Sequence, residues 1–315
     1  MTPRKSPRQV LWMVVRILVP IGLIGWLLAR MDWQTVWPML RRMPGWTLAV
    51  SALFFTLSEV VTAFRWHYLL RFQGMKVSFL RLVGLVFVGI FASNFLPTTI
   101  GGDVVKIVGV VQDPEKRTVA ATSVLADRLY NLLGMALLLP LALLVSDIPR
   151  VHSTQAVLFS IVGIAGLPAW SKLRVRIVRT WKDVRRWFTS PVCILTALAL
   201  SWLSIAMAFG AFWIITIGMD IHISYWQASA ISLITYFIAL VPISINGFGV
   251  MEGSRTYLLT LMGALPEQAT AAAFLIRLVT IAVSLLGGVR LLWGWRDLLK
   301  ARQAPDPESS GEQGG

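Results

Sequence analysis

Long apolar runs separated by short polar or charged segments make up most of the chain. Two longer apolar regions, 82–112 and 225–264, are each interrupted near the middle by proline and glycine. The uninterrupted runs suit membrane-spanning helices; they cover about 10–30, 46–70, 119–145, 155–170, 191–217 and 268–294. The pattern predicts an all-α polytopic membrane protein with about six spanning helices and two broken or re-entrant helical hairpins.

The two interruptions resemble each other. One reads PTTIGGDVVK from Pro97 to Lys106, and the other reads PISINGFGVME from Pro242 to Glu252. Proline and glycine break helices, and a broken helix at membrane depth is tolerated only inside protein or beside a polar cavity. Corresponding breaks are typical of a transporter binding site. The expected hinge residues are Pro97, Gly101, Gly102, Pro242, Gly247 and Gly249.

Composition agrees with a membrane protein. The 315 residues are 56% hydrophobic and 14% charged, with a mean hydropathy of +0.70, whereas soluble domains carry about 25% charged residues. The net charge of +14 would suggest nucleic-acid binding in a soluble protein. Here the basic residues lie between apolar runs, so we expect no nucleic-acid partner. Neither the single cysteine, Cys193, nor the three histidines show metal-ligand spacing, and we expect no metal or cofactor.

Basic loops predict the topology. Seven basic residues lie between 172 and 186, against one acid, which indicates a cytoplasmic loop. Both termini are also predicted to be cytoplasmic, because basic residues lie before residue 9 and after residue 290. The same holds for the basic residues at 71–81 and at 116–117. Hairpin 82–112 then enters from the inside and hairpin 225–264 from the outside, which is an inverted repeat. Two complete membrane spans in place of each hairpin would leave the sidedness of all other segments unchanged. Arg41 and Arg42 fall on the outer side, which the positive-inside rule does not favour.

The likeness extends into the helices that follow the hairpins. The segment 114–121 resembles 266–273, since each begins with Pro-Glu at a helix start. Each helix then carries an arginine within its apolar run, Arg128 in one and Arg277 in the other. These matches favour an internal duplication.

Several charged residues lie at membrane depth, where each would cost about 2.5–3.5 kcal/mol if it faced lipid. Asp103 and Lys106 are three residues apart, as are Glu252 and Arg255, so each pair shares a helix face. Basic side chains beside helix starts suit a phosphate, while the acids would face a cationic group, carry a proton or hold the arginines. The alternative is a set of internal salt bridges, for Glu59 and Arg65 in particular. The predicted substrate-binding residues are Asp103, Lys106, Asp127, Arg128, Asn246, Glu252, Arg255 and Arg277. The charged residues of the two repeats are expected to converge on one polar cavity near the membrane midplane, where a phosphate-containing lipid head group would be handled.

These motifs resemble a known family, the flippase-like membrane domain of lysylphosphatidylglycerol synthase/flippase proteins. The matching residues are Asn94-Phe95-Leu96-Pro97 with Gly101-Gly102-Asp103, Asp127-Arg128, and Pro242-x-Ser244-x-Asn246-Gly247-x-Gly249 with Glu252-Gly253. The family usually has arginine where Lys106 stands. Bifunctional members carry a soluble aminoacyl-transfer domain after the membrane part, and this chain shows none. The resemblance therefore implies lipid translocation and argues against lipid lysylation.

The leading hypothesis is a lipid flippase or transporter of the bacterial cytoplasmic membrane, with a cytoplasmic tail at 1–9, one transmembrane domain at 10–296 and a disordered tail at 297–315. No Walker A sequence is present. One alternative is a membrane-embedded transferase that acts on a lipid-linked substrate, although no paired-acid motif is found. Another is a non-catalytic assembly partner of the cell envelope. The expected partners are membrane lipids, and a homo-oligomer or a cell-envelope biosynthesis partner is also considered.

Overall fold

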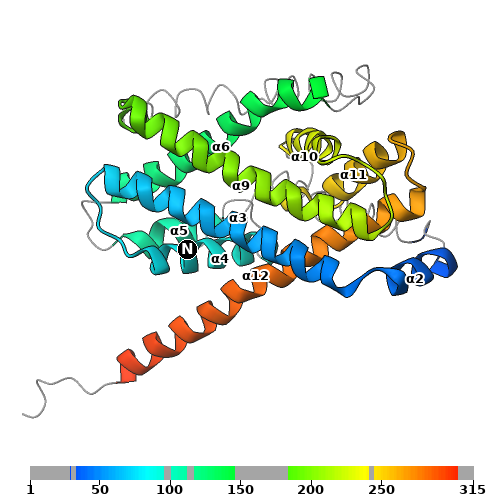
Figure 1. The fold of residues 1–315 in the computed structure, drawn as a ribbon. Coiled ribbons are helices and arrows are strands. Elements are labelled where there is room, and N and C mark those ends of the chain that lie inside the picture. The colour runs from blue at the N-terminus through cyan, green and yellow to red at the C-terminus, as the bar shows by residue number, and fades with distance from the viewer. Residues whose placement is uncertain are drawn as a thin grey trace, which may run out of the picture.

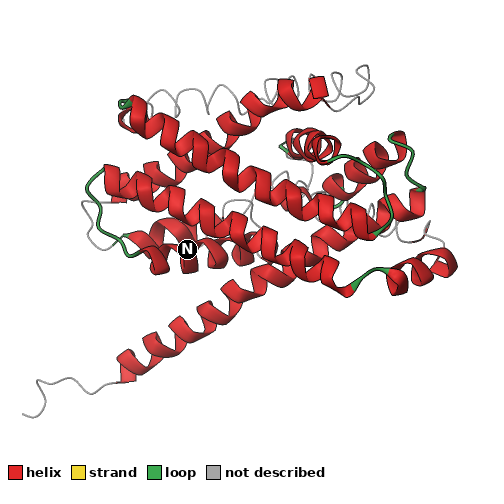
Figure 2. Cartoon of the chain, in the orientation of Figure 1, coloured by secondary structure: helices red, strands yellow, loops and turns green. Residues whose placement is uncertain are grey.

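In the computed structural model, every regular element of the described residues is helical (Figure 2). The structure describes Ala29 and residues 33–95, 101–111, 117–145, 184–240 and 245–303. The predicted helices at 10–30 and 155–170 therefore lie outside the described residues, apart from Ala29. So do Pro97 and Pro242.

Four described helices are long and apolar enough to cross a membrane, and all four were predicted. They are α3 (Gly45–Phe72), α6 (Arg117–Val145), α9 (Pro191–Gly218) and α12 (Pro266–Gln303). Proline begins α9 and α12, where its missing N–H costs no hydrogen bond. The apolar part of α12 ends near Leu291, but the helix continues to Gln303, past the predicted domain limit of 296.

The two interrupted regions form pairs of short helices. In the first, α4 (Phe79–Phe95) is followed by α5 (Gly101–Val110). In the second, α10 (Tyr225–Ala239) is followed by a 3₁₀ turn, η3 (Ile245–Gly247), and then by α11 (Val250–Leu261). With ten and twelve residues, α5 and α11 are about 15–18 Å long at the helical rise, too short to cross a hydrocarbon core of about 30 Å.

Helices α4 and α5 run antiparallel and pack closely. Arg81, at the start of α4, donates a hydrogen bond to the carbonyl of Gly109, at the end of α5, at 2.8 Å. Near the other end, a Cβ placed on Gly102 would overlap the carbonyl oxygen of Gly89 and the hydroxyl of Ser93. Glycine is therefore required at 102, and the pair has the hairpin shape that the sequence predicts.

The long helices frame these hairpins. Helices α3 and α9 lie side by side, and α12 crosses beneath them in Figure 1. Helix α4 packs on α12, where a Cβ on Gly287 would overlap the backbone of Phe87. Such close approach through glycine is typical of membrane helices. One buried apolar cluster joins α3, α4, α5 and α6, and a larger one is centred on α9, α10, α11 and α12.

Two short elements were not predicted. Helix α2 (Trp33–Arg42) lies against α12 and ends with Arg41 and Arg42 in its last turn. The 3₁₀ turn η2 (Arg186–Phe188) precedes α9 and buries Trp187. Neither has the long apolar run by which the sequence marks the other helices.

Candidate functional site

Within the described ranges, three ion pairs connect charged residues of the long helices and the hairpins. Arg65 pairs with Asp127, Arg128 with Asp103, and Arg277 with Glu252. Asp103 and Glu252 occupy the first turns of α5 and α11, while the arginines at 128 and 277 lie within α6 and α12. The predicted site residues therefore group around the two hairpins.

The second helix break is built from backbone that favours glycine. Asn246, Gly247 and Gly249 have φ angles of 51°, 70° and 76°, in the left-handed region that glycine and asparagine tolerate best. These residues turn the chain so that α11 starts at Val250. The N–H of Gly249 then donates a hydrogen bond of 2.6 Å to the carboxylate of Glu252.

Glu252 is fully buried and accepts from two elements. One carboxylate oxygen accepts from Gly249, at the start of its own helix, and the other accepts from Nε of Arg277 on α12. The position favours a negative charge, because a helix N-terminus carries exposed N–H groups. Glu252 therefore fixes the break and holds Arg277 beside it.

Positive charge exceeds negative charge at this break. Arg255, one turn after Glu252, stacks its guanidinium over the ring of Phe212 at 5.2 Å, and the guanidinium of Arg277 lies 4.4 Å from the ring centroid of Phe248. Two arginines thus face one carboxylate. Nε of Arg255 and Nη2 of Arg277 are buried and make no hydrogen bond within the described residues. Buried N–H groups without partners are costly, so this cluster is suited to an anion.

The first hairpin has a similar but more open arrangement. Nη2 of Arg128 lies 2.6 Å from the carboxylate of Asp103, and 55% of the Arg128 side chain is exposed, compared with 10% for Arg277. The ammonium of Lys106 lies 6.0 Å from the ring centroid of Trp66 on α3. Glu59, on the same helix, lies within electrostatic reach of Lys106 and Arg65.

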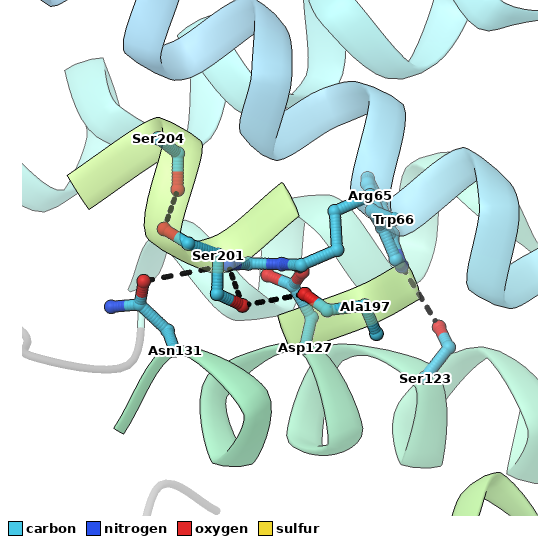
Figure 3. A network of polar contacts seen from close by, with 8 residues as sticks. All are labelled: Arg65, Trp66, Ser123, Asp127, Asn131, Ala197, Ser201 and Ser204. Carbon is cyan, nitrogen blue, oxygen red and sulfur yellow. Dashed lines mark hydrogen bonds and ion pairs between the residues drawn. The ribbon is translucent and has the colours of Figure 1, made fainter. Parts of the chain in front are cut away.

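The third ion pair belongs to a buried network between α3, α6 and α9 (Figure 3). Nε of Arg65 donates to Asp127 at 2.7 Å, and its Nη1 donates to Ser201 at 2.8 Å and to Asn131 at 3.4 Å. Only 2% of the Arg65 side chain is exposed. Asp127, which was predicted to bind substrate, therefore has Arg65 as its partner, and the sequence did not assign Arg65 to the site.

A direct contact joins the two hairpins. Asn246 Nδ2, in the second break, donates to Asn94 Oδ1, near the end of α4, at 2.8 Å. Asn94 was quoted in the family motif but was not among the predicted site residues. Arg128 and Arg277 are each ion-paired within their own half of the chain, so the described ion pairs do not join these two arginines in one cluster. The asparagine contact adds to the packing of the two halves, in which α3 lies on α9 and α4 on α12.

Of the other predicted residues, Gly101 begins α5 and Gly102 lies in the close contact with α4.

Within the described part of the chain, no three His, Cys, Asp or Glu side chains are grouped so that they could hold a metal ion.

Comparison with known proteins agrees with the fold. Residues 13–288 match the family described as the lysylphosphatidylglycerol synthase TM region. The chain is also 27% identical over 123 residues to the UPF0104 membrane protein PH1989 of Pyrococcus horikoshii, a match that covers 38% of this chain and 36% of that protein. The chain thus spans about a third of the length of that relative. The family match covers most of the sequence, and the chain belongs to the lysylphosphatidylglycerol synthase transmembrane-region family.

Proposed function

We propose that the protein moves lipids with phosphate-containing head groups between the leaflets of a membrane, and that the two broken hairpins form the polar path for the head group. The observation that carries this proposal is the cluster of Glu252, Arg255 and Arg277. It has one excess positive charge and two buried guanidinium nitrogens without partners among the described residues. A lipid phosphate supplies the missing charge and the missing acceptors.

The hairpins are proposed to belong to an inverted repeat, in which α3–α6 correspond to α9–α12. Helix contacts support this, since α4 packs on α12 as α10 packs on α6, and α3 packs on α4 as α9 packs on α10. The ion pairs support it as well. Asp103 and Glu252 are each the third residue of their helices, and Arg128 and Arg277 are each the twelfth.

An inverted repeat offers a mechanism for alternating exposure. In the proposal, the open pair Asp103–Arg128 is accessible in one state while the enclosed pair Glu252–Arg277 is closed, and the two exchange roles in the other state. Asn94 and Asn246 link the hairpins, so their movements are coupled. The proposal assigns both termini to the cytoplasm and the protein to the bacterial cytoplasmic membrane, on the basis of the basic loops.

Substitutions of the two arginines test their assigned role. A fluorescent phospholipid in proteoliposomes reports movement between leaflets through quenching of the outer leaflet. Arg277→Ala and Arg128→Ala are expected to slow this movement at least tenfold, because about 1.4 kcal/mol of lost phosphate interaction already corresponds to a factor of ten. Lysine keeps the charge but loses the two-pronged contact, so Arg277→Lys retains part of the activity.

The matched control is Arg185→Ala, which removes an exposed arginine outside the hairpins. Each variant is first shown to be folded by thermal unfolding in detergent. Unchanged lipid movement in folded Arg128→Ala and Arg277→Ala proteins would remove these residues from the mechanism.

A further inference from the structure

The turn between α3 and α4 lines a shallow, open hollow at the surface that the translocation site does not use. It has a volume of about 350 Å³ and is lined by His67, Arg71, Lys76, Val77 and Ser78. The turn forms because Gly74 adopts a φ of 76° directly after α3 ends. The five residues that line the hollow define what is called here the α3–α4 hollow.

The charge of the hollow is positive. Its lining contains Arg71 and Lys76 and no acid. Neither of these two side chains forms an ion pair with a residue of the described ranges. His67 contributes an imidazole whose Nδ1 is buried without a hydrogen-bond partner there. Arg71 and Lys76 are therefore available to bind an anion together, whereas His67 already makes a hydrogen bond to the backbone of Val77.

The start of α4 adds hydrogen-bond donors. The carbonyl of Ser78 accepts the N–H of Leu82 at 3.2 Å, so the helix begins just after Ser78. The first N–H groups of a helix have no partner within it and favour an anion such as phosphate. The Ser78 hydroxyl belongs to the same lining.

We infer that the α3–α4 hollow binds the phosphate of an anionic membrane lipid, as a surface site separate from the path of translocation. Arg71 lies in the last turn of a helix that is long and apolar enough to span a membrane, which would bring it to the level of the lipid phosphates. The side chains next to the lining residues are apolar and exposed: Phe72 by 40% and Leu80 by 75%. They suit acyl chains, which a free phosphate lacks.

The turn between α9 and α10 provides a comparison within the same molecule. It also joins a long helix to a hairpin, but it carries Asp220 and His222, whose side chains lie 3.7 Å apart. An acid there removes the positive excess. The basic hollow is therefore a property of the α3–α4 turn and not of such turns in general.

Photocrosslinking tests this site in the full chain. Leu80 is replaced by a photoreactive phenylalanine analogue, the protein is placed in vesicles of equimolar phosphatidylglycerol and phosphatidylcholine, and the crosslinked lipids are measured by mass spectrometry. Phosphatidylglycerol is expected to exceed its share of the vesicle. The variant Arg71→Gln/Lys76→Gln should reduce that enrichment, by about fivefold for each charge removed.

Two controls separate this inference from general charge and from translocation. Arg42→Gln/Arg185→Gln removes the same charge from exposed positions outside the hollow and should keep the enrichment, as should Arg277→Ala. Absence of enrichment, or an equal loss in the control pair, would overturn the site. Full competition by inorganic phosphate would also overturn it, because the ligand would then be a soluble anion.

Discussion

The three ion pairs differ in how completely their charges are satisfied. Arg65 makes hydrogen bonds to Asp127, Ser201 and Asn131, so its guanidinium is well supplied with acceptors. Arg277 has Glu252 as its acceptor, and its Nη2 makes no hydrogen bond with the described residues. The first arrangement is suited to fixing helices α3, α6 and α9, and the second to receiving an anion.

Breaking the Arg65–Asp127 pair is expected to destabilise the fold. Asp127→Asn leaves the Arg65 charge buried and uncompensated, which typically costs about 3–5 kcal/mol of unfolding free energy. Replacing both residues, as Arg65→Met/Asp127→Leu, should recover most of this loss. Denaturant unfolding in detergent measures the change. The control is Asp220→Asn, at an 86% exposed side chain, with an expected change within about 0.5 kcal/mol. Additive losses in the double variant would contradict this account.

For individual residues, the sequence predicted which charged side chains need a partner better than it predicted which residue each partner is. The cost of charge in lipid marks Asp103, Arg128, Glu252 and Arg277 as residues that need partners, and all four are found in ion pairs. The pairing of Arg65 with Asp127 depends on how α3 packs on α6, and no spacing along the chain records that packing. The same reason hides the contact between Asn94 and Asn246.

The helical hairpins are the elements that bring these residues together. Proline and glycine in an apolar run predict a break directly, and the described chain turns through Asn246, Gly247 and Gly249 before α11. The first predicted break falls at 96–100, outside the described residues. The close contact of Gly102 with Gly89 shows how tightly the hairpin that contains it is packed.

A methyl group at Gly102 is expected to force α4 and α5 apart. The added Cβ would overlap the carbonyl oxygen of Gly89, and overpacking of this kind typically costs about 1–3 kcal/mol. Gly102→Ala should therefore lower stability and slow lipid movement. Gly45→Ala is the matched control, because a Cβ at Gly45 would meet no atom within 4 Å. Thermal unfolding and the proteoliposome assay measure both effects. Equal behaviour of the two variants would show that the hairpin can open without cost.

Considered as a whole molecule, the helices were predictable because a bilayer requires long apolar segments. The predicted run 46–70 corresponds to α3, and 191–217 corresponds to α9, each within two residues at its ends. Helix α2 was missed because it has only ten residues and a mixed composition. The predicted opposite entry of the hairpins rests on the distribution of basic loops and stays a prediction.

Cysteine labelling tests that opposite entry. In a Cys193→Ser background, single cysteines are placed at Arg185 and Val111 for the inner side, and at His222 and Leu265 for the outer side. An impermeant maleimide should label positions 222 and 265 in intact cells, and positions 185 and 111 only after permeabilisation. Labelling of 111 and 265 from the same side would contradict the inverted arrangement.

Lipid translocation itself is the central claim, and reconstitution of the wild-type chain tests it most directly. Proteoliposomes with fluorescent phosphatidylglycerol are compared with protein-free liposomes, and the lipids are analysed afterwards by mass spectrometry. The account predicts faster exchange between leaflets in the proteoliposomes and an unchanged lipid mass. Exchange no faster than in protein-free liposomes, with a new covalent lipid product, would contradict the account and favour a transferase.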